Sequence, residues 1–436
     1  MKRGARYLLE LARSQPGRLE LKRRYSSNLW PVFAYLARLY RRTLGRRPRI
    51  VAVIGSVGKT TTMRTVSAVL ERPVRRPALL NANSHAAVGR ALLAVRPWDR
   101  NAVIEVAINA PGQMHVQAAT LRPQVVVVTA IARDHWRSFG TLEATRHAKA
   151  DMLRRLPASA VVVANADDPH VRWMATQTRA RVVLAGEADD AEVRATDVAL
   201  DWPRGMRFTV SIGGQAWPAT TRLVGRHMLF GALAALTVGH LEGVPMEVAI
   251  RRLAAVEPTP GRMQTMALTS GAYALRDEFK ASEHTFDAAL ETLAQIPARR
   301  KIGVLGEVAE ESGHAAYREL GHKAASLDQI VFVGSRKRMT TLRAAATAAG
   351  MAPDRVRHVH NAHEALALVR GELGPGDVLF IKGRWQQALG RVGLALAGRD
   401  VQCRADPCPF KRMLCDVCPF LGQPFEGLPG TRVESG

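Results

Sequence analysis

Short runs of consecutive apolar residues recur along the chain at intervals that leave room for a helix between them. In the first half they are VAVI at 51–54, VIEVAI at 103–108, VVVVTAI at 125–131 and VVVAN at 161–165. Runs of this length are typical of strands that are buried on both faces of a parallel sheet. Stretches with helical spacing, such as 60–70, 112–121 and 141–156, lie between them. The alternation predicts an α/β fold with a doubly wound, mostly parallel sheet and right-handed crossovers.

The pattern changes twice further along. Residues 182–222 change character and contain Gly213-Gly214, which predicts a small, mostly antiparallel insert with a tight hairpin turn. A helix-rich stretch follows at 227–256, and the sequence EPTPGRM at 257–263 is typical of a linker. A second α/β pattern then begins, with strand candidates YALRDEF, KIGVLGEV, QIVFVGS, RVRHVH and DVLFIKG. This half predicts a separate, Rossmann-like α/β domain.

We therefore divide the 436 residues into a basic helical arm at 1–48, a central domain at 49–258, a C-terminal domain at 259–400 and a cysteine-rich tail at 401–436. Hydrophobic residues make up 47% of the chain and charged residues 23%, as in ordinary soluble proteins. No apolar stretch approaches the roughly 18 residues that a membrane span needs. The apolar run near the start is too short and broken for a secretory signal, so we expect a cytoplasmic protein.

Positive charge is concentrated in the arm. Residues 1–49 carry fourteen Lys or Arg against Glu10 and Glu20, a net charge of +12, which is half of the chain's +24. Apolar side chains recur there at roughly helical spacing. Such an arm is a candidate for peripheral contact with an anionic membrane, RNA, an anionic substrate or a protein partner, and the alternative is a solvated helix pair packed on the next domain. No RNA-binding motif with interleaved aromatics is present, so we predict no specific nucleic acid.

The first strand candidate ends in a glycine-rich turn that is typical of phosphate binding. The stretch is Gly55, Ser56, Val57, Gly58, Lys59, Thr60, Thr61, followed by a helix. Backbone N–H groups at such a helix N-terminus can bind phosphate oxygens, Lys59 would reach the β and γ phosphates, and Thr60 would bind Mg²⁺. The usual Walker spacing would place a glycine at position 53, where the chain has a valine.

The short form G-x-x-G-K-[ST]-[ST] after a strand resembles the Mur ligase family, and the rest of the chain continues the resemblance in order from about residue 49 to 395. The further segments are NANSHAAVG at 81–89, VIEVAINAPGQM at 103–114, TAIARDHWRSFGTLEATRHAKADM at 129–152, NADDPH at 165–170, GRHMLFGALAAL at 225–236, GRM at 261–263, LRDEFKASEHTFDAAL at 275–290 and FIKGRW at 380–385. The branch it resembles most adds D-alanyl-D-alanine.

The resemblance implies an ATP-dependent ligase that converts a carboxylate to an acyl phosphate, which an amine then attacks, giving ADP and phosphate. It implies that Thr60 and Glu105 bind one Mg²⁺, and that His135 and a carbamylated Lys149 bind a second. Lys59 and Arg262 would stabilise the charge on the transferred phosphoryl group, and Asp277 would hold the ribose of ATP. A carbamate suits Mg²⁺ because it turns a cationic side chain into an oxygen donor.

The chain departs from the family pattern at several positions. Met228 and Gly231 stand where the helix motif G-x-H-N-x-x-N has asparagines, and Lys280 stands where this branch has asparagine. Only about fifty residues precede the loop, where the peptidoglycan enzymes have a UDP-binding domain. We therefore expect a ligase for small-molecule or peptide carboxylates and amines with a non-standard acceptor. The alternative is a degenerate ATP-binding scaffold whose basic arm binds a membrane or RNA.

All four cysteines of the chain lie in the tail. Cys403, Cys408, Cys415 and Cys418 have the spacing C-x₄-C-x₆-C-x₂-C. Four thiols within sixteen residues favour a tetrahedral Zn²⁺ site in a cytosolic protein. The Cys-Pro pairs keep an iron–sulfur cluster open as the rival, and unmetallated thiols are the third alternative. Any of these lies outside the residues that the family resemblance assigns to catalysis.

Overall fold

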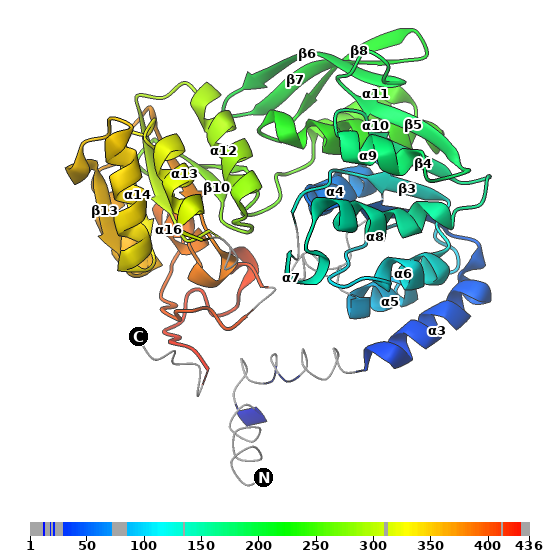
Figure 1. Cartoon of the computed structure of the whole chain (residues 1–436), viewed down its shortest axis with the longest axis horizontal. Helices are drawn as coiled ribbons and strands as arrows, with labels where there is room; N and C mark the ends of the chain where they lie inside the picture. Colours follow the sequence, from blue (N-terminus) through cyan, green and yellow to red (C-terminus); the bar gives the residue numbers. More distant parts are fainter. Residues whose placement is uncertain are drawn as a thin grey trace. The chain divides into compact units, whose positions relative to one another are not determined.

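The structure is a computed structural model that describes residues 12–13, 18, 21, 29–71, 85–133, 136–308, 313–410 and 413–428. These residues form two compact units. We call residues 23–201 and 205–257 the P-loop unit, and the unit that is chiefly residues 258–436 the C-terminal unit. Each is described here by itself, and Figure 1 identifies their elements.

The P-loop unit is built on one eight-stranded sheet in the order β2-β1-β3-β4-β5-β6-β7-β8. Its strands are β1 (Arg49–Ile54), β2 (Asn101–Glu105), β3 (Val125–Val128), β4 (Val161–Asn165), β5 (Arg181–Gly186), β6 (Val193–Asp201), β7 (Gly205–Ile212) and β8 (Gln215–Thr221). Pairing is parallel from β2 to β6 and antiparallel from β6 to β8. The mostly parallel doubly wound sheet predicted from the apolar runs is confirmed.

Helices cover both faces of this sheet, as Figure 1 shows. They are α3 (Trp30–Arg42), α4 (Lys59–Val69), α5 (His85–Leu93), α6 (Gln113–Leu121), α7 (Trp136–Phe139), α8 (Leu142–Arg154), α9 (Pro169–Ala175), α10 (Leu229–Leu241) and α11 (Met246–Ala254), with short 3-10 turns η1 (Leu44–Arg46) and η3 (Arg226–Met228). Within β1, Val51 and Val53 pack toward α4, α10 and α11, whereas Ile50 and Ala52 pack toward α5 and α6. The strand is uniformly apolar because alternate residues enter two different cores.

The antiparallel segment continues the main sheet instead of forming a separate insert. Strand β6 pairs with β5, so β6, β7 and β8 extend the same sheet. The predicted hairpin turn joins β7 to β8, and both of its glycines have positive φ, 58° at Gly213 and 80° at Gly214. A two-residue turn of this kind favours glycine because side chains strain at positive φ.

The C-terminal unit has a six-stranded sheet in the order β13-β12-β11-β14-β10-β9, parallel except for β9. Its strands are β9 (Gln264–Ala267), β10 (Tyr273–Asp277), β11 (Arg300–Leu305), β12 (Gln329–Val333), β13 (Val356–Val359) and β14 (Asp377–Lys382). Its helices are α12 (Glu283–Gln295), α13 (His314–Ala324), α14 (Arg336–Ala348), α15 (Ala362–Val369) and α16 (Gly390–Leu396), with 3-10 turns η4 (Pro353–Arg355), η5 (Trp385–Gln387) and η6 (Cys415–Val417). All five strand candidates from the sequence are present.

Candidate functional site

The glycine-rich loop lies at the carboxyl end of β1, which is the central strand of the order β2-β1-β3. The chain runs from β1 to β2 on one side and then crosses to β3 on the other. In open α/β sheets, ligands bind at such a switch point, outside the carboxyl ends of the strands. Position therefore supports a binding site here independently of the loop's sequence.

Two glycines shape the loop. Gly55 has φ of 138°, and a Cβ there would lie 2.1 Å from Oγ1 of Thr129. Gly58 has φ of 80° and is the residue from which α4 begins. The valine at 53 is fully buried in β1 and faces a hydrophobic core. The missing Walker glycine is therefore explained by geometry, because position 53 is still strand and the turn starts two residues later.

Lys59 folds back over the loop. Its Nζ donates to the carbonyl oxygens of Gly55 and Ser56, both at 2.9 Å, and the residue is 7% exposed. The ammonium is held at the first turn of α4, where the positive end of the helix dipole also favours anions. This arrangement concentrates positive potential at one small part of the loop.

Thr60 in the first turn of α4 and Glu105 at the end of β2 meet beside the loop. The Thr60 hydroxyl donates to Oε2 of Glu105 at 2.8 Å, and both residues are buried. Val53 is paired with Glu105 in the sheet, so the carboxylate sits at the end of β2 beside the loop. Adjacent ligands of an octahedral Mg²⁺ ion, each at about 2.1 Å, are about 3 Å apart. The two oxygens have the spacing that one ion needs.

Lys149 reaches the same loop from α8. Its Nζ donates to the Gly55 carbonyl at 2.8 Å, and the residue is 1% exposed. The side-chain oxygen of Thr141 accepts from the Ala144 N–H and starts the helix that carries the lysine. The fold thus brings together Lys59, Thr60, Glu105 and Lys149, and the prediction for His135 lies outside the described residues.

Thr129 is part of this loop although sequence reasoning missed it. Its hydroxyl lies 3.1 Å from the Ile54 carbonyl and 2.6 Å from the Val57 carbonyl, which ties the end of β3 to the turn. Asp168 supports the next residues in the same way, since its Oδ2 accepts from the Ile131 N–H at 2.8 Å. The sequence shows only that Thr129 is a polar residue at the end of the apolar run that forms β3, the strand beside β1.

The departure at Gly231 has a packing reason. Helix α10 packs against α4, and a Cβ at Gly231 would lie 3.3 Å from Oγ1 of Thr62. The Thr65 hydroxyl also donates to the Gly231 carbonyl at 2.7 Å. An asparagine at 231 would have to displace these contacts. Glycine at this position therefore allows α10 and α4 to pack closely.

In the C-terminal unit, Asp277 lies at the end of β10 and already has protein partners. Its Oδ1 accepts from the Met263 N–H at 3.1 Å, and its Oδ2 pairs with Nζ of Lys382 at the end of β14. Burial raises the pKa of Asp277, and Lys382 opposes that rise. The Arg262 guanidinium lies over the Phe279 ring, 4.3 Å from its centre. The sequence did not predict that Asp277 pairs with Lys382 or that Arg262 lies over Phe279.

A network of buried ion pairs is centred on Arg276, the residue before Asp277 in β10. Arg276 is fully buried and donates to both carboxylate oxygens of Asp416, at 2.8 and 2.9 Å, and through Nε to Oε1 of Glu278 at 3.1 Å. Although burial raises it, the pKa of Asp416 stays below its usual value because of the bonds from Arg276. The only sequence signal was an arginine inside an apolar strand run.

The predicted metal site at the four cysteines is not supported. All four thiols are described and free of disulfides. Among the residues that the structure describes, no three His, Cys, Asp or Glu side chains are already arranged to hold a metal ion. Neither the zinc site nor the iron–sulfur cluster is therefore present as a preformed ligand set.

Comparison with known families matches both units. The Mur ligase middle domain matches residues 53–239, and the Mur ligase, glutamate ligase domain matches residues 261–385. The chain is 32% identical over 375 residues to the UDP-N-acetylmuramoyl-tripeptide–D-alanyl-D-alanine ligase of Mycobacterium tuberculosis, covering 80% of this chain and 73% of that protein. The enzyme of the same name from Escherichia coli is 28% identical over 295 residues, 66% of this chain and 65% of that protein.

Solved structures agree on the fold. MurF from Acinetobacter baumannii superposes with a TM-score of 0.73 at 21% identity, over 85% of this chain and 81% of that one. MurF from Thermotoga maritima in complex with ADP superposes with a TM-score of 0.70 at 20% identity, over 84% and 83% of the two chains.

Proposed function

Because the chain belongs to the Mur ligase family of ATP-dependent amide ligases and is MurF-like, we propose that it joins a carboxylate to an amine through an acyl phosphate, releasing ADP and phosphate. The observation that carries the proposal is the convergence of Lys59, Thr60, Glu105 and Lys149 on one turn. A turn that only bound phosphate would need Lys59 and Thr60. The carboxylate and the second lysine are what an oxygen-binding metal site adds.

The chemistry explains why such a cluster is useful. A carboxylate is a poor electrophile, and transfer of the γ-phosphoryl group of ATP to one of its oxygens supplies a leaving group. The amine then attacks the acyl carbon, and phosphate leaves with the electron pair of the C–O bond. Charge on the transferred phosphoryl oxygens is stabilised by positioned cations and N–H donors rather than by covalent contact.

The residue roles follow from where the loop holds each group. Lys59 and the first N–H groups of α4 bind the terminal phosphates of ATP. Thr60 and Glu105 would hold Mg²⁺, which would supply positive charge to the phosphate oxygens. If Lys149 is carbamylated by CO₂, it would become an oxygen donor in place of its present bond to the Gly55 carbonyl, and together with His135 it would hold a second Mg²⁺.

Two further residues of the family pattern lie in the C-terminal unit. Arg262 binds the transferred phosphoryl group, and Asp277 binds the ribose of ATP. Both residues are adjacent to backbone turns at the start of that unit, and Phe279 and Lys382 hold them in place. The roles of these residues rest on the family pattern together with their local contacts.

The experiment is a turnover panel. The purified chain is incubated with ATP, Mg²⁺ and pairs of acids and amines that include UDP-N-acetylmuramoyl tripeptide with D-alanyl-D-alanine. We expect phosphate release that requires both acid and amine, and a product mass equal to their sum less water. The panel also tests the expected non-standard acceptor. ATP binding without turnover for any pair would favour the degenerate scaffold instead.

A second property is proposed for the arm. Helix α3 packs on α5 and α6 through Ala37. Its N-cap residue Leu29 and the helical residues Val32, Leu36 and Leu39 recur at intervals of three and four residues and are 42–53% exposed. No helix in the described part of the chain is long and apolar enough to cross a membrane. The exposed apolar face and the basic arm fit the surface of an anionic membrane.

Vesicle sedimentation tests the arm. The full chain should pellet with phosphatidylglycerol-containing vesicles and stay in the supernatant with pure phosphatidylcholine. The double variant Leu36→Ser/Leu39→Ser should lose this binding, while Val417→Ser, at an exposed position of the tail, should keep it. Equal binding by both variants, or binding to RNA but not to vesicles, would reject the membrane role.

A further inference from the structure

The tail beyond the matched family segments packs against the C-terminal unit. The Cys408 N–H donates to the Gln386 carbonyl in η5 at 2.9 Å. Further along the tail, the carboxylate of Asp416 accepts from the Arg276 guanidinium at 2.8 and 2.9 Å. The tail therefore adds walls to the region where β10 ends, and these walls lie outside the family pattern.

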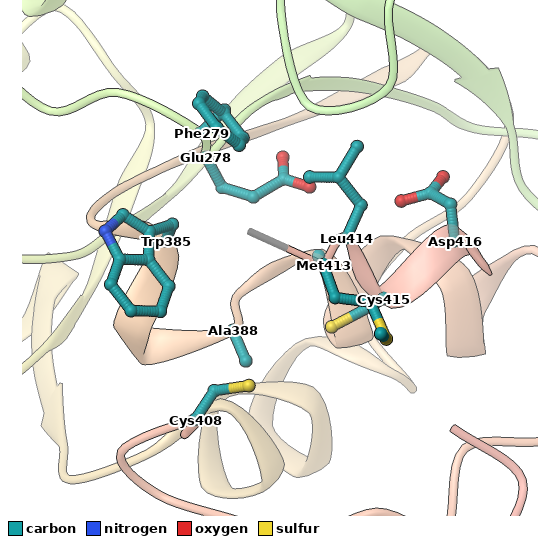
Figure 2. A pocket seen from close by; sticks show the side chains of 10 residues that line it. Glu278, Phe279, Trp385, Ala388, Cys408, Met413, Leu414, Cys415 and Asp416 are labelled. Carbon is teal, nitrogen blue, oxygen red and sulfur yellow. The ribbon is translucent and has the colours of Figure 1, made fainter. Parts of the chain in front are cut away.

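A small cavity of about 30 Å³ lies between the tail and the end of β10. Glu278 and Phe279 line it from the end of β10, Trp385 lines it from η5, and Met413 and Asp416 line it from the tail. Figure 2 shows Glu278 and Phe279 above this space, Trp385 to its left and Asp416 to its right. Phe279, Trp385 and Met413 are partly exposed, which puts the cavity close to solvent.

Glu278 has one carboxylate oxygen without a hydrogen-bond partner. The residue is only 5% exposed, and its Oε1 accepts from Nε of Arg276 at 3.1 Å, whereas its Oε2 has no partner. Gly390, which also lines the cavity, leaves room for this carboxylate, because a Cβ there would lie 2.6 Å from Oε1. An unpartnered buried oxygen is costly and therefore indicates that a donor is missing.

The ion pairs around Glu278 are also short of one positive charge. Their described members are two cations and three carboxylates, namely Arg276 and Lys382 against Asp277, Glu278 and Asp416, a net charge of −1. Burial raises the pKa of Glu278, Arg276 opposes the rise, and the charge of Asp416 adds to it. Protonation of Glu278 would cancel the charge, but its O–H would then lack an acceptor.

Two other arginines of this unit have different partners. Nη1 of Arg391 donates to the Ala405 carbonyl at 2.8 Å, and its charge opposes the rise that burial causes in the pKa of Asp406. Arg399 is exposed, and its Nη1 donates to the backbone carbonyl of Asp416 at 2.8 Å. Neither guanidinium is bonded to the free oxygen of Glu278.

We propose that this cavity binds a primary ammonium group, –NH₃⁺, against Oε2 of Glu278. The ammonium donates to the free oxygen and supplies the missing positive charge. It also lies beside Phe279 and Trp385, and the faces of aromatic rings attract cations. A volume of about 30 Å³ holds roughly two non-hydrogen atoms. It therefore fits a free ammonium ion or the –CH₂–NH₃⁺ end of an alkylamine, and it excludes a quaternary ammonium ion.

Two other occupants explain less. A water molecule would donate to Oε2 of Glu278 but would bring no charge, so the ion pairs would keep their net charge of −1. A metal ion needs several ligands, and among the residues that the structure describes no three His, Cys, Asp or Glu side chains are placed to hold one. An ammonium group needs one carboxylate oxygen and an aromatic wall, and both are present.

The cavity is connected to the proposed ligase chemistry through one ring. Phe279 lines the cavity, and the Arg262 guanidinium lies over the same ring, 4.3 Å from its centre. If Arg262 binds the transferred phosphoryl group, an ammonium beside Phe279 belongs to the amine substrate, as a second amino group that does not react. This consequence for the substrate rests on the proposed function, whereas the ammonium site itself does not.

The melting temperature of the full chain tests the site. Methylammonium chloride should raise it by about 2–4 °C relative to sodium chloride at the same ionic strength, because a ligand that binds only the folded state stabilises it. Ammonium chloride is the second arm. A shift as large as with methylammonium assigns the site to the free ion, and a smaller shift assigns it to the end of an alkylamine. Tetramethylammonium chloride should give no shift, because the ion exceeds the cavity.

Variants locate the effect. Glu278→Gln keeps an oxygen for Arg276 and removes the charge, so it should lose the methylammonium shift. Glu283→Gln, at an exposed position of α12, is the matched control and should keep it. Because Glu278→Gln can itself change stability, each variant is compared with its own melting temperature in sodium chloride. Trp385→Leu leaves every charge in place and should weaken the shift.

Three results would overturn the ammonium site. They are a wild-type melting temperature that is the same in methylammonium and sodium chloride, a shift that Glu278→Gln retains in full, and an equal shift with tetramethylammonium. The first result is also what a cavity filled by water predicts. None of these measurements depends on ligase activity.

Turnover tests the consequence for the substrate separately. With the acid that is active in the panel, L-lysine should have a KM several-fold lower than norleucine, which lacks the second amino group. Glu278→Gln should raise the KM for lysine and leave that for norleucine unchanged. Equal values for the two amines would contradict the role in substrate binding. No turnover with any amine would reject the proposed function and leave the ammonium site to be judged by the melting temperatures.

Discussion

The strand ends of the two units hold two polar clusters that are built in different ways. At the end of β1, Lys59 and Thr60 come from one short motif, and Glu105 and Lys149 join them from the next strand and from α8. At the end of β10, two successive charged residues each pair with a distant one, Arg276 with Asp416 and Asp277 with Lys382. The first cluster is organised around backbone that can bind a ligand. The second is organised around its own buried charges.

This difference predicts different responses to mutation. The groups at the end of β1 bond mainly to backbone carbonyls. Losing one of these side chains should therefore leave the fold largely intact and remove a contact with the nucleotide. Groups in the C-terminal cluster neutralise each other in the protein interior. Removing one of them leaves an uncompensated buried charge, which costs stability.

The largest effect is expected for Lys59→Ala. Loss of the ammonium removes positive charge from the phosphate site, and we expect kcat to fall about 10³-fold, as for other groups that stabilise a transferred phosphoryl. Amine-dependent phosphate release measures it, and Lys337→Ala, at an exposed position of α14, is the control. Melting temperatures within a degree or two of wild type would show that the loss is chemical. If the Lys59→Ala variant stays active, the glycine-rich loop takes no part in the mechanism.

The next effect is on stability rather than turnover. Arg276→Met fills the same space but leaves Glu278 and Asp416 buried without their cation, and we expect the free energy of unfolding to fall by about 3–5 kcal/mol. Urea unfolding of the C-terminal unit is the measurement. The double variant Arg276→Met/Asp416→Leu should recover part of the loss. A single variant as stable as wild type would show that the network is not a buried ion pair at all.

A smaller effect on turnover is expected for Thr60→Val, which keeps the shape of the side chain and removes the hydroxyl. The variant should need a higher Mg²⁺ concentration and should lose about 10²-fold in kcat, because the oxygen beside Glu105 is gone. Thr60→Ser keeps that oxygen and is the matched control. If both variants respond equally to Mg²⁺, the threonine is not a metal ligand.

The smallest effect concerns acid stability. The side chain of Asp377 is buried, and although burial raises its pKa, the guanidinium groups of Arg300 and Arg299 hold that pKa well below its usual value. A lowered folded-state pKa stabilises the protein above the unfolded value near pH 4, and this contribution is lost as pH falls through the folded value. Asp377→Asn should cost about 2 kcal/mol at pH 7 and less below pH 4. A difference from wild type that stays constant between pH 7 and pH 3 would contradict the assignment.

Sequence reasoning predicted most of the fold because apolar runs of four to six residues, as in β1 and β3, are typical of strands that are buried on both faces. It reached the P-loop cluster because Lys59 and Thr60 have fixed places in a turn that glycines define. It did not reach Thr129, or the pairing of Arg276 with Asp416, because those contacts join segments 72 and 140 residues apart and depend on how the whole sheet brings them together. It also treated 182–222 as an insert, since alternation reveals a strand but not the sheet it joins.

One measurement tests the central claim most directly. The chain is given ATP, Mg²⁺ and the acid and amine pair that turns over in the panel, with the carboxylate of the acid labelled with ¹⁸O. If the carboxylate attacks the γ-phosphoryl group, one labelled oxygen must leave with the phosphate when the amine displaces it. We therefore predict ADP and phosphate that carries one ¹⁸O per product formed. Label-free phosphate during turnover, AMP with pyrophosphate, or no turnover with any pair would contradict the account.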